Sequence, residues 1–228
     1  PAIWRRMELD TDIAIIGGGL NGSTLALALA QAGLHVTLID AHASTTQDEP
    51  SFDGRSYAMA LTSTRLLNGV GVWDAIKDKV QPMLEIKVTD GRAGSGPSPM
   101  FMHFDHAEIE EGPMGYMVED RYLRHALRQK VVADPRISML ESETVTQQDA
   151  DVSGITLALS SGQTLRVRLA VGADGRKTQT AKRSGIKHTR WDYAQTALVC
   201  AIEHEQPHQG VAHQFFMPPG PLAILPLP

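Results

Sequence analysis

A glycine-rich turn between two apolar stretches limits the possible folds of this chain most strongly. Residues 13–16 form a continuous apolar run rich in β-branched side chains, which is typical of a strand buried in a parallel sheet. The turn GGGLNG follows at residues 17–22, and the Ala- and Leu-rich residues 20–32 favour a helix that ends near Gly33. Residues 35–39 are again apolar. The sequence therefore predicts a strand-helix-strand unit with a short crossover.

The glycines of this turn have the spacing G-x-G-x-x-G, at Gly17, Gly19 and Gly22. The first permits the turn, the second lets the backbone approach a pyrophosphate, and the third lets helix and strand pack closely. The N-terminus of the helix then faces the phosphates with free N–H groups and the positive end of its dipole. Asp40 ends the second strand, where its carboxylate can accept the hydroxyls of an unphosphorylated adenosine ribose. The pattern favours dinucleotide binding over a purely structural turn and leaves FAD and NAD as alternatives.

A second candidate site follows another apolar stretch. Residues 165–171 predict a buried strand that runs into Gly172, Ala173, Asp174 and Gly175. Such a strand delivers a carboxylate to the carboxyl edge of a sheet, which is where α/β proteins bind ligands. The glycine-rich turn is expected at the same edge.

Four segments occur in the order found in flavoprotein aromatic hydroxylases, which the chain resembles. They are the GGGLNG turn with Asp40, then FDGRSYAMALTSTRLLNGVGVWDAI, MVEDRYLRHAL and GADGRKT. Within that group, FDGRSYAMA and the closing GPLAILPLP are similar to the ubiquinone-biosynthesis hydroxylases, in particular the 2-octaprenyl-6-methoxyphenol hydroxylase type. The likeness extends from about Met7 to Pro228.

This resemblance implies FAD as the cofactor, while it identifies no catalytic side chain. It places the glycine-rich turn at the pyrophosphate, the end of the second strand at the adenosine ribose, and residues 174–175 near the ribitol and pyrophosphate. Two arginines would also approach the cofactor. The residues concerned are Gly17, Gly19, Leu20, Asn21, Gly22, Asp40, Ala41, Arg55, Arg121, Asp174 and Gly175. Two positions depart from the family pattern. Thr178 stands where a serine is usual, and Ala181 stands where an arginine is frequent.

The resemblance also implies the architecture. The fold expected is an α/β, Rossmann-like FAD-binding domain of the glutathione-reductase type with an inserted mixed-sheet substrate domain, in truncated form. The FAD-binding domain would comprise residues 7–80 and 113–186, and the substrate domain residues 81–112 and 187–228. The later family segment GDAAH…P…GQG has no counterpart here, which predicts that the chain is the front part of a longer enzyme.

The activity implied is hydroxylation of a polyprenylated phenol by O2 in ubiquinone biosynthesis, through a flavin C4a-hydroperoxide, with NAD(P)H or another electron donor as reductant. The expected location is the cytoplasm. The protein is further expected to associate with a membrane surface, with a biosynthetic complex or with a second copy of itself. Two alternatives stay open. One is another FAD oxidoreductase of the same fold, such as a reductase or halogenase, and the other is a non-catalytic fragment.

Apolar patterns elsewhere predict further elements. We expect helices over residues 62–69 and 120–133, a hairpin of strands 85–90 and 100–106, and a loop over residues 41–52. Further strands are expected at residues 137–141, on both sides of residues 160–163, at 197–201 and at 222–227. The Met100–Phe104 run is interpreted as core rather than as the lining of a pocket.

Composition excludes several classes. A net charge of −5 gives no basic patch for nucleic acid. The longest apolar run is too short to cross a bilayer. The single cysteine, Cys200, forms no internal disulfide and is placed in an apolar strand that would keep its thiol neutral. Neither histidine cluster, His103 with His106 or His204 with His208 and His213, has metal-ligand spacing, so no metal is expected.

Overall fold

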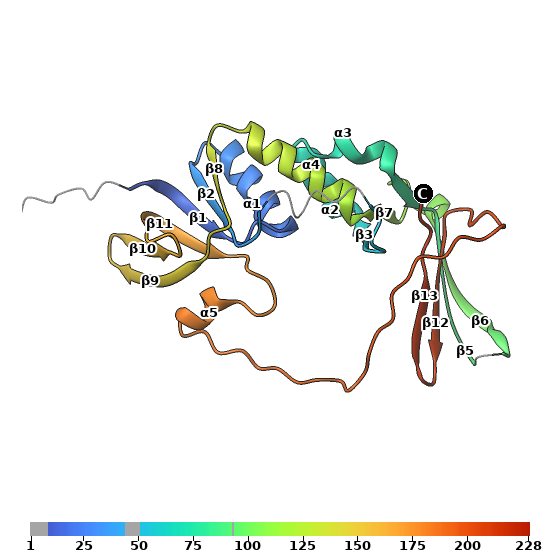
Figure 1. Cartoon of the computed structure of the whole chain (residues 1–228). Helices are drawn as coiled ribbons and strands as arrows, with labels where there is room; N and C mark the ends of the chain where they lie inside the picture. Colours follow the sequence, from blue (N-terminus) through green and yellow to red (C-terminus); the bar gives the residue numbers. More distant parts are fainter. Residues whose placement is uncertain (1–8, 44–50, 93) are drawn as a thin grey trace, which may run out of the picture. The chain divides into compact units, whose positions relative to one another are not determined.

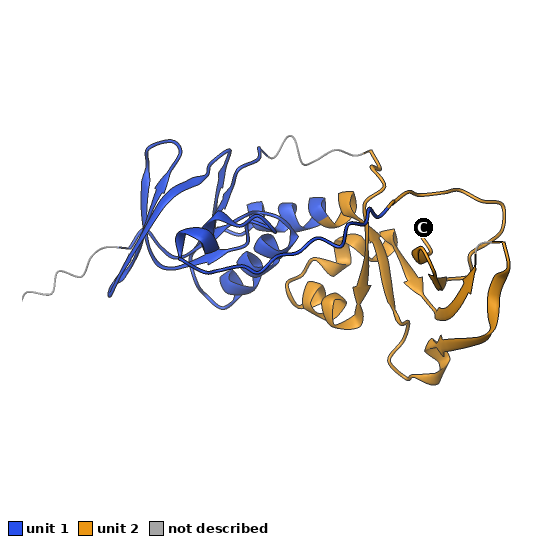
Figure 2. Ribbon diagram, turned by 90° about the horizontal axis from the view of Figure 1, so that it is seen from below, with its two compact units in different colours: residues 1–50, 124–197 blue, residues 51–123, 198–228 orange. Residues whose placement is uncertain are grey.

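The computed structural model describes residues 9–43, 51–92 and 94–228, which form two compact units. Unit 1 comprises residues 1–50 and 124–197, and unit 2 comprises residues 51–123 and 198–228 (Figure 2). The units change at Ser51, Arg124 and Leu198, whereas the predicted domain segments change at residues 81, 113 and 187. Those domain limits stay a prediction. Met7 and most of the predicted 41–52 loop lie outside the described residues.

Unit 1 is built on a six-stranded sheet with the order β8-β2-β1-β11-β10-β9 (Figure 1). Strands β8, β2, β1 and β11 are parallel, and β10 and β9 continue the sheet in antiparallel fashion. The strands are β1 (Thr11–Ile16), β2 (Val36–Asp40), β8 (Ile137–Glu141), β9 (Val145–Asp151), β10 (Gly154–Leu159) and β11 (Thr164–Gly172). This sheet and its order give the α/β class that the sequence predicts.

Helix α1 (Leu20–Gln31) connects β1 to β2 and packs against β1, β2 and β8, so the predicted strand-helix-strand unit is confirmed. It ends as expected, because Gly33 adopts a φ of +87° and the Leu34 N–H donates to the Leu29 carbonyl. The other helices are α4 (Asp120–Ala133), whose residues from Arg124 onward belong to unit 1, and α5 (Gln179–Arg183). One face of the sheet buries a cluster that includes Ile16, Leu157 and Val167.

Unit 2 contains two smaller sheets, with the orders β3-β7-β4 and β13-β12-β5-β6. Their strands are β3 (Ser56–Ala60), β4 (Val80–Met83), β5 (Glu85–Arg92), β6 (Gly96–Asp105), β7 (Gly115–Glu119), β12 (Val211–Met217) and β13 (Gly220–Ile224). The helical segments are α2 (Leu61–Gly69), α3 (Trp73–Ile76), η2 (Lys77–Lys79) and η3 (His106–Glu108). The predicted β5–β6 hairpin is confirmed. Strand β12 then pairs with β5 in parallel, although the two are far apart in the chain.

Three expectations are wrong, and they concern unit 2 and the segment that leads into it from unit 1. The chain forms no strand at residues 197–201, where Leu198 and Val199 are 92% and 81% exposed. Alternating apolar residues alone do not supply the neighbouring strand whose backbone groups must pair with theirs. Cys200 is consequently exposed instead of lying in an apolar strand. The last strand was expected at residues 222–227, whereas β13 spans Gly220–Ile224 and its ladder with β12 ends at the pair His213 and Ile224.

The Met100–Phe104 run is not core either. Met100 and Met102 are 84% and 60% exposed, and they line an open groove of about 450 Å³ on the four-stranded sheet together with Val88 and Phe216. Among the described residues, no helix combines the length and apolar character needed to cross a bilayer.

Candidate functional site

The glycine-rich turn joins the end of β1 to the start of α1, and its three motif glycines have different surroundings. A Cβ on Gly17, whose φ is +109°, would lie 2.3 Å from the carbonyl oxygen of Ala173. A Cβ on Gly22 would lie 1.9 Å from the carbonyl oxygen of Gly17. Both positions therefore require glycine for packing. Gly19 differs, because a Cβ there would meet no atom within 4 Å, so the backbone beside Gly19 is open to a ligand.

Helix α1 begins directly at this opening. Gly19 is its N-cap residue and supplies no side-chain hydrogen bond, and the first turn contains no acidic residue. The first N–H groups of a helix lack intrahelical partners and carry the positive end of the helix dipole. The arrangement suits an anionic group such as a pyrophosphate. Leu20 and the exposed Asn21 are the first residues of this helix.

Asp40 ends β2 beside the turn and is only 6% exposed. Its Oδ2 accepts a 2.6 Å hydrogen bond from the Gly18 N–H, and its Oδ1 accepts a 2.7 Å bond from the His42 N–H. The His42 ring nitrogen Nδ1 lies 3.2 Å from the same Oδ1. These bonds fix the carboxylate beside the turn, and a carboxylate oxygen can accept more than one hydrogen bond. Ala41 is exposed next to it.

The end of β11 is held against the end of β1. The Ala173 N–H donates to the Ile16 carbonyl at 2.7 Å, and the Ala173 carbonyl is the group that a Cβ on Gly17 would strike. The two predicted motifs therefore meet at one sheet edge, as the parallel order of β1 and β11 requires. Gly175 follows, exposed and with a φ of +78°.

Asp174 is fixed by the segment that leads into α5. Its Oδ2 accepts hydrogen bonds from the Gln179 N–H, the Thr180 N–H and the Thr180 hydroxyl, at 2.8, 3.0 and 3.0 Å. Burial raises the pKa of the Asp174 carboxyl, but the hydrogen bonds from Thr178, Thr180 and Gln179 outweigh it and leave the pKa below its usual value. Within the described residues, its buried Oδ1 has no hydrogen-bond partner.

One of the two departures from the family pattern has a local explanation. The Thr178 hydroxyl accepts a 3.2 Å hydrogen bond from the Ala181 N–H and so caps α5. Threonine thus performs the capping role that a serine would. At position 181 the cap uses the backbone N–H, which alanine provides as well as arginine.

Both predicted arginines belong to unit 2. Arg55 donates from Nε to Asp53 at 2.6 Å, and its terminal nitrogen lies 3.3 Å from Asp120 Oδ2. Arg121 donates from Nε to Glu119 at 2.6 Å.

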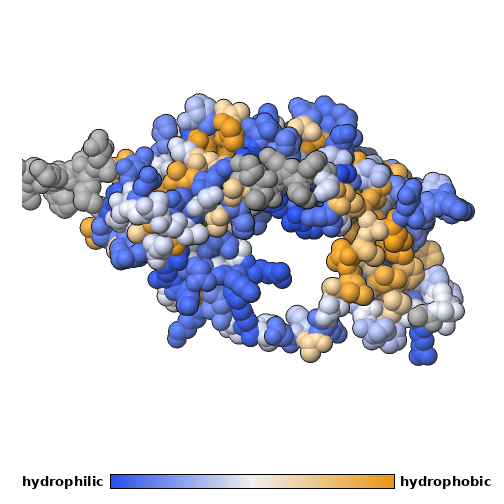
Figure 3. Space-filling model, in the orientation of Figure 1, coloured by the Kyte–Doolittle hydropathy of each residue, from blue (hydrophilic) through white to orange (hydrophobic). Residues whose placement is uncertain are grey.

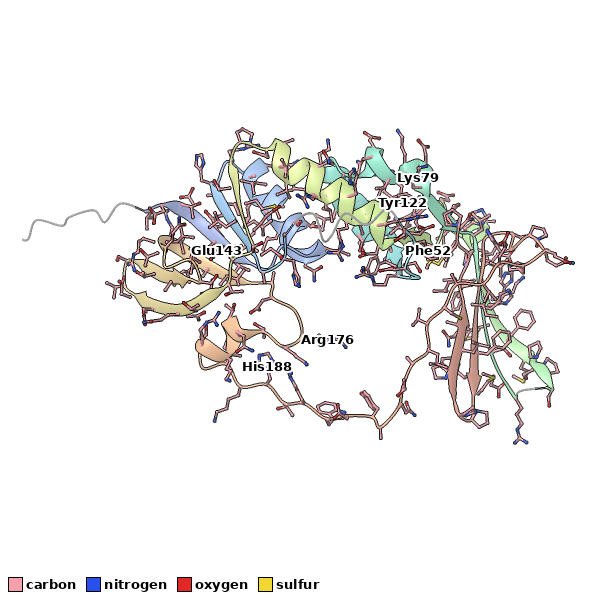
Figure 4. The ribbon with its side chains drawn as sticks, in the orientation of Figure 1. Phe52, Lys79, Tyr122, Glu143, Arg176 and His188 are labelled. Atoms are coloured by element: carbon pink, nitrogen blue, oxygen red, sulfur yellow. The ribbon has the colours of Figure 1, made fainter. Side chains whose placement is uncertain are left out.

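The Arg121 guanidinium also lies near two aromatic rings. Its central carbon is 4.7 Å from the Tyr122 ring centroid and 5.6 Å from the Phe52 ring centroid. The Lys79 ammonium lies 5.6 Å from the Tyr122 ring centroid (Figure 4). Cations over aromatic faces are attracted by the ring quadrupole, which adds to the ion pair in holding Arg121.

The sequence interpretation missed the residues that hold these site groups in place. They are His42 beside Asp40, and Tyr57, Glu119 and Asp120 beside the arginines. A usable signal was the acidic dipeptide at positions 119–120, which directly precedes Arg121 and lies between an apolar stretch and a predicted helix. In the parts of the chain that the structure describes, no three His, Cys, Asp or Glu residues gather as metal ligands would.

The described geometry fits an adenine dinucleotide such as FAD. Open backbone at Gly19, the uncapped start of α1 and a fixed carboxylate at Asp40 lie in one unit. The turn supplies N–H donors for phosphates, and the carboxylate supplies acceptors for ribose hydroxyls.

Comparison with known proteins agrees with this fit. The chain is 44% identical over 217 residues to the ubiquinone hydroxylase UbiL of Rhodospirillum rubrum, covering 95% of this chain and 49% of that protein. It is 34% identical to the 3-demethoxyubiquinol 3-hydroxylase of Escherichia coli, covering 95% of this chain and 54% of that protein. The chain thus spans about half the length of these curated relatives.

A solved structure with the same fold is that of PqsL, a probable FAD-dependent monooxygenase from Pseudomonas aeruginosa. It superposes with a TM-score of 0.65 at 20% identity, covering 80% of this chain and 48% of that one. The family described as FAD binding domain matches residues 10–218, which include every site residue discussed above. The chain therefore belongs to the FAD binding domain family.

Proposed function

We propose that this chain is part of an FAD-dependent monooxygenase that hydroxylates a polyprenylated phenol in ubiquinone biosynthesis. The observation that carries the proposal is the 44% identity to a ubiquinone hydroxylase over a segment that includes the whole glycine-rich turn. Its second support is the ligand-ready geometry of that turn. A reductase or halogenase of the same fold has no comparable support.

We also propose which residues contact FAD. The pyrophosphate would lie at the glycine-rich turn, the adenosine ribose at the end of β2, and other parts of the cofactor at the second motif and the two arginines. The residues assigned in this way are Gly17, Gly19, Leu20, Asn21, Gly22, Asp40, Ala41, Arg55, Arg121, Asp174 and Gly175. For the residues of unit 1 the support comes from the packing and hydrogen bonds described above together with the family resemblance. For Arg55 and Arg121 the support is the resemblance alone.

When bound, FAD supplies the redox chemistry that lets O2 react with an electron-rich phenol. One oxygen atom enters the ring as a hydroxyl and the other leaves as water, with two electrons from NAD(P)H or another donor. The residues of this chain would bind and orient the cofactor, because backbone N–H groups of the glycine-rich turn can donate to phosphate oxygens and Asp40 can accept from ribose hydroxyls. Because the substrate carries a polyprenyl chain, association with a membrane surface or a biosynthetic complex is part of the proposal, as is self-association.

The test is a visible absorbance spectrum of the purified 228-residue chain after addition of FAD and desalting. We expect a retained flavin band. A Gly19→Val variant should lose the band while still unfolding cooperatively with a modestly lowered thermal midpoint, because the new side chain fills open space where the phosphates would lie and valine is a poorer N-cap than glycine. Gly69→Val is the matched control, since Gly69 in α2 also faces open space but lies outside the proposed site. A colourless wild-type protein, or a Gly19→Val variant that retains flavin, would contradict the proposed cofactor site.

Activity is tested by incubating the FAD-loaded chain with a short-chain prenylated phenol, NAD(P)H and O2. We expect a product heavier by one oxygen atom in mass spectrometry. A flavin-loaded chain without product would instead support the second candidate, a cofactor-binding segment without turnover. That candidate is favoured by the half-length coverage of the relatives.

A further inference from the structure

Residues 176–190 of unit 1 concentrate positive charge in a chain whose net charge is −5. This stretch, called the basic segment below, holds six of the 21 lysines and arginines and none of the 26 aspartates and glutamates. The net charge therefore conceals a local excess of positive charge, and the rest of the chain is correspondingly more acidic. The six cationic residues are Arg176, Lys177, Lys182, Arg183, Lys187 and Arg190.

The basic segment folds back on itself. The Arg190 guanidinium donates to the carbonyl oxygen of Arg176, which joins the two ends of the segment. Between them, the Ile186 N–H donates to the Ala181 carbonyl at 3.0 Å, directly after α5. Figure 4 labels Arg176 and His188, which lie near these two ends. The charges are therefore gathered around α5 instead of being spread along an extended chain.

The cationic side chains of the basic segment have no carboxylate partner within the described residues. All of them except Arg183 are exposed, and Arg183 donates to the amide oxygen of Gln148 at 3.4 Å. Elsewhere in unit 1 arginines are paired with acids, as in the 2.6 Å ion pair between Arg166 and Asp151. Positive charges that gather on a surface without counter-charges attract anionic partners.

Apolar and aromatic side chains are exposed beside these charges. Ile186 lies within the basic segment and is 59% exposed, and Trp191 and Tyr193 follow just after it at 69% and 78%. Indole and phenol rings favour the boundary between lipid headgroups and acyl chains. Clusters of lysine and arginine bind anionic headgroups, and each added charge strengthens the binding. An exposed isoleucine contributes to lipid contact but neither to phosphate pairing nor to base stacking, so the combination favours a lipid surface over nucleic acid.

We propose that the basic segment, together with Ile186, Trp191 and Tyr193, is the surface by which unit 1 binds an anionic lipid bilayer. The lysine and arginine side chains contact headgroup phosphates, and the three other side chains enter the headgroup region. The more acidic remainder of the chain is repelled by the same bilayer, which orients this surface toward the lipid. The inference deepens the proposed function, and it rests on that proposal for the membrane association named there.

The test is co-sedimentation of the 228-residue chain with vesicles of phosphatidylglycerol and phosphatidylcholine, compared with vesicles of phosphatidylcholine alone. We expect binding to the anionic vesicles, weakened at high salt because dissolved ions screen exposed charges. The triple variant Lys177→Gln, Lys182→Gln and Lys187→Gln should bind the anionic vesicles ~100-fold more weakly than the wild type. Binding that is equal for neutral and anionic vesicles would overturn the inference.

The matched control is the triple variant Lys77→Gln, Lys79→Gln and Lys130→Gln. It replaces three exposed lysines outside the basic segment and has the same net charge as the first variant. It should bind the anionic vesicles within about 3-fold of the wild type, because the attraction acts only within about a Debye length of the lipid surface. Equal losses in the two triple variants would mean that net charge alone governs binding, and would overturn the proposed surface.

Trp191 supplies a second readout. The tryptophan fluorescence of the chain should shift to shorter wavelength on addition of anionic vesicles, because the indole leaves water, and Trp191→Phe should abolish the shift. Vesicle binding without this shift would overturn the proposed contact. Binding to a single-stranded oligonucleotide that is lost in the basic-segment variant, without vesicle binding, would assign the surface to nucleic acid and overturn the inference.

Flavin retention separates this inference from the proposed function. A chain that binds anionic vesicles as expected but retains no flavin would contradict the proposed cofactor site and leave the lipid-binding surface supported. A chain that retains flavin but does not bind anionic vesicles would overturn the inference and leave the cofactor site supported.

Discussion

Both units contain strands with large apolar side chains, but the two units differ in how far these side chains are buried. In unit 1, β1 and β2 are almost entirely buried, and backbone groups at their ends pack against one another around Gly17 and Gly22. In unit 2, apolar side chains gather on the surface of the four-stranded sheet (Figure 3). Met100 is 84% and Phe216 is 56% exposed. Unit 1 therefore fixes the backbone of the glycine-rich turn by close packing, whereas the sheet of unit 2 presents side chains to solvent. Substitutions should be costly in unit 1 and tolerated on the open face of unit 2.

The largest effect is expected at Gly22. A Gly22→Val substitution forces a side chain onto the Gly17 carbonyl and should cost about 4 kcal/mol of unfolding free energy, at the upper end for overpacking. Urea unfolding followed by circular dichroism measures this. The matched substitution Gly69→Val in unit 2, where a Cβ meets nothing within 4 Å, should change the unfolding free energy by less than about 0.5 kcal/mol, because valine is a better helix former than glycine. Similar losses in both variants would remove the contrast between the units.

The next effect concerns the core of unit 1. Leu157 is 0% exposed and belongs to the buried cluster on one face of the six-stranded sheet. Leu157→Ala should lower the unfolding free energy by about 3 kcal/mol, from lost burial and the cavity left behind. The measurement is the urea midpoint at constant slope. A loss below about 1 kcal/mol would mean that this sheet is packed as loosely as the exposed face in unit 2.

A pH-dependent effect is expected at Asp174. Because its pKa is lowered in the folded state, the carboxylate stabilises the fold above its unfolded pKa of about 4, and this contribution is lost as the pH falls through the folded pKa. Asp174→Asn should therefore cost about 1 kcal/mol at pH 7, after discounting for partial exposure, and progressively less as the pH falls below about 4.

The comparison for that effect is Glu85 in unit 2. Lys87 and His103 lower the pKa of the Glu85 carboxyl by hydrogen bonding, but the group is solvated. Glu85→Gln should change the pH dependence of unfolding less than Asp174→Asn does. Urea unfolding at pH 7, 4 and 2 checks both variants, and a pH-independent loss in Asp174→Asn would contradict an electrostatic origin.

The smallest effect is expected at Met100, on the open face of unit 2. Met100→Ala removes a side chain that is 84% exposed and should change the unfolding free energy by less than about 0.5 kcal/mol. Thermal unfolding measures the shift, with Leu157→Ala as the buried reference. A loss above about 1 kcal/mol would show that the groove lined by Met100 and Phe216 contributes to folding stability.

Local sequence patterns were enough to predict the main elements of unit 1. Residues 13–40 contain their own strand pattern, turn glycines, helix formers and end signal, so the strand-helix-strand unit follows from short-range preferences. The helix Asp120–Ala133 and the strand Ile137–Glu141 were predicted with the same limits. The candidate ligands at Gly19, Asp40 and Asp174 were proposed from residue type and spacing, and their role stays a prediction. Strand 197–201 was predicted from alternation alone and was wrong, since alternation specifies a face and no pairing partner.

The groups that hold the site residues in place are set by the tertiary structure instead. The hydrogen bonds from Gly18 to Asp40 and from Tyr57 to Asp120 join residues far apart in the chain, and no sequence pattern marks them. The bond from His42 to Asp40 spans only two residues, which is too short a pattern to recognise in the sequence. The parallel pairing of β5 with β12, which joins the two hairpins of the four-stranded sheet in unit 2, likewise has no sequence signal. Short-range sequence patterns encode the conformation of a segment. Which side chains meet across segments depends on strand register and packing, and these are set by the whole fold.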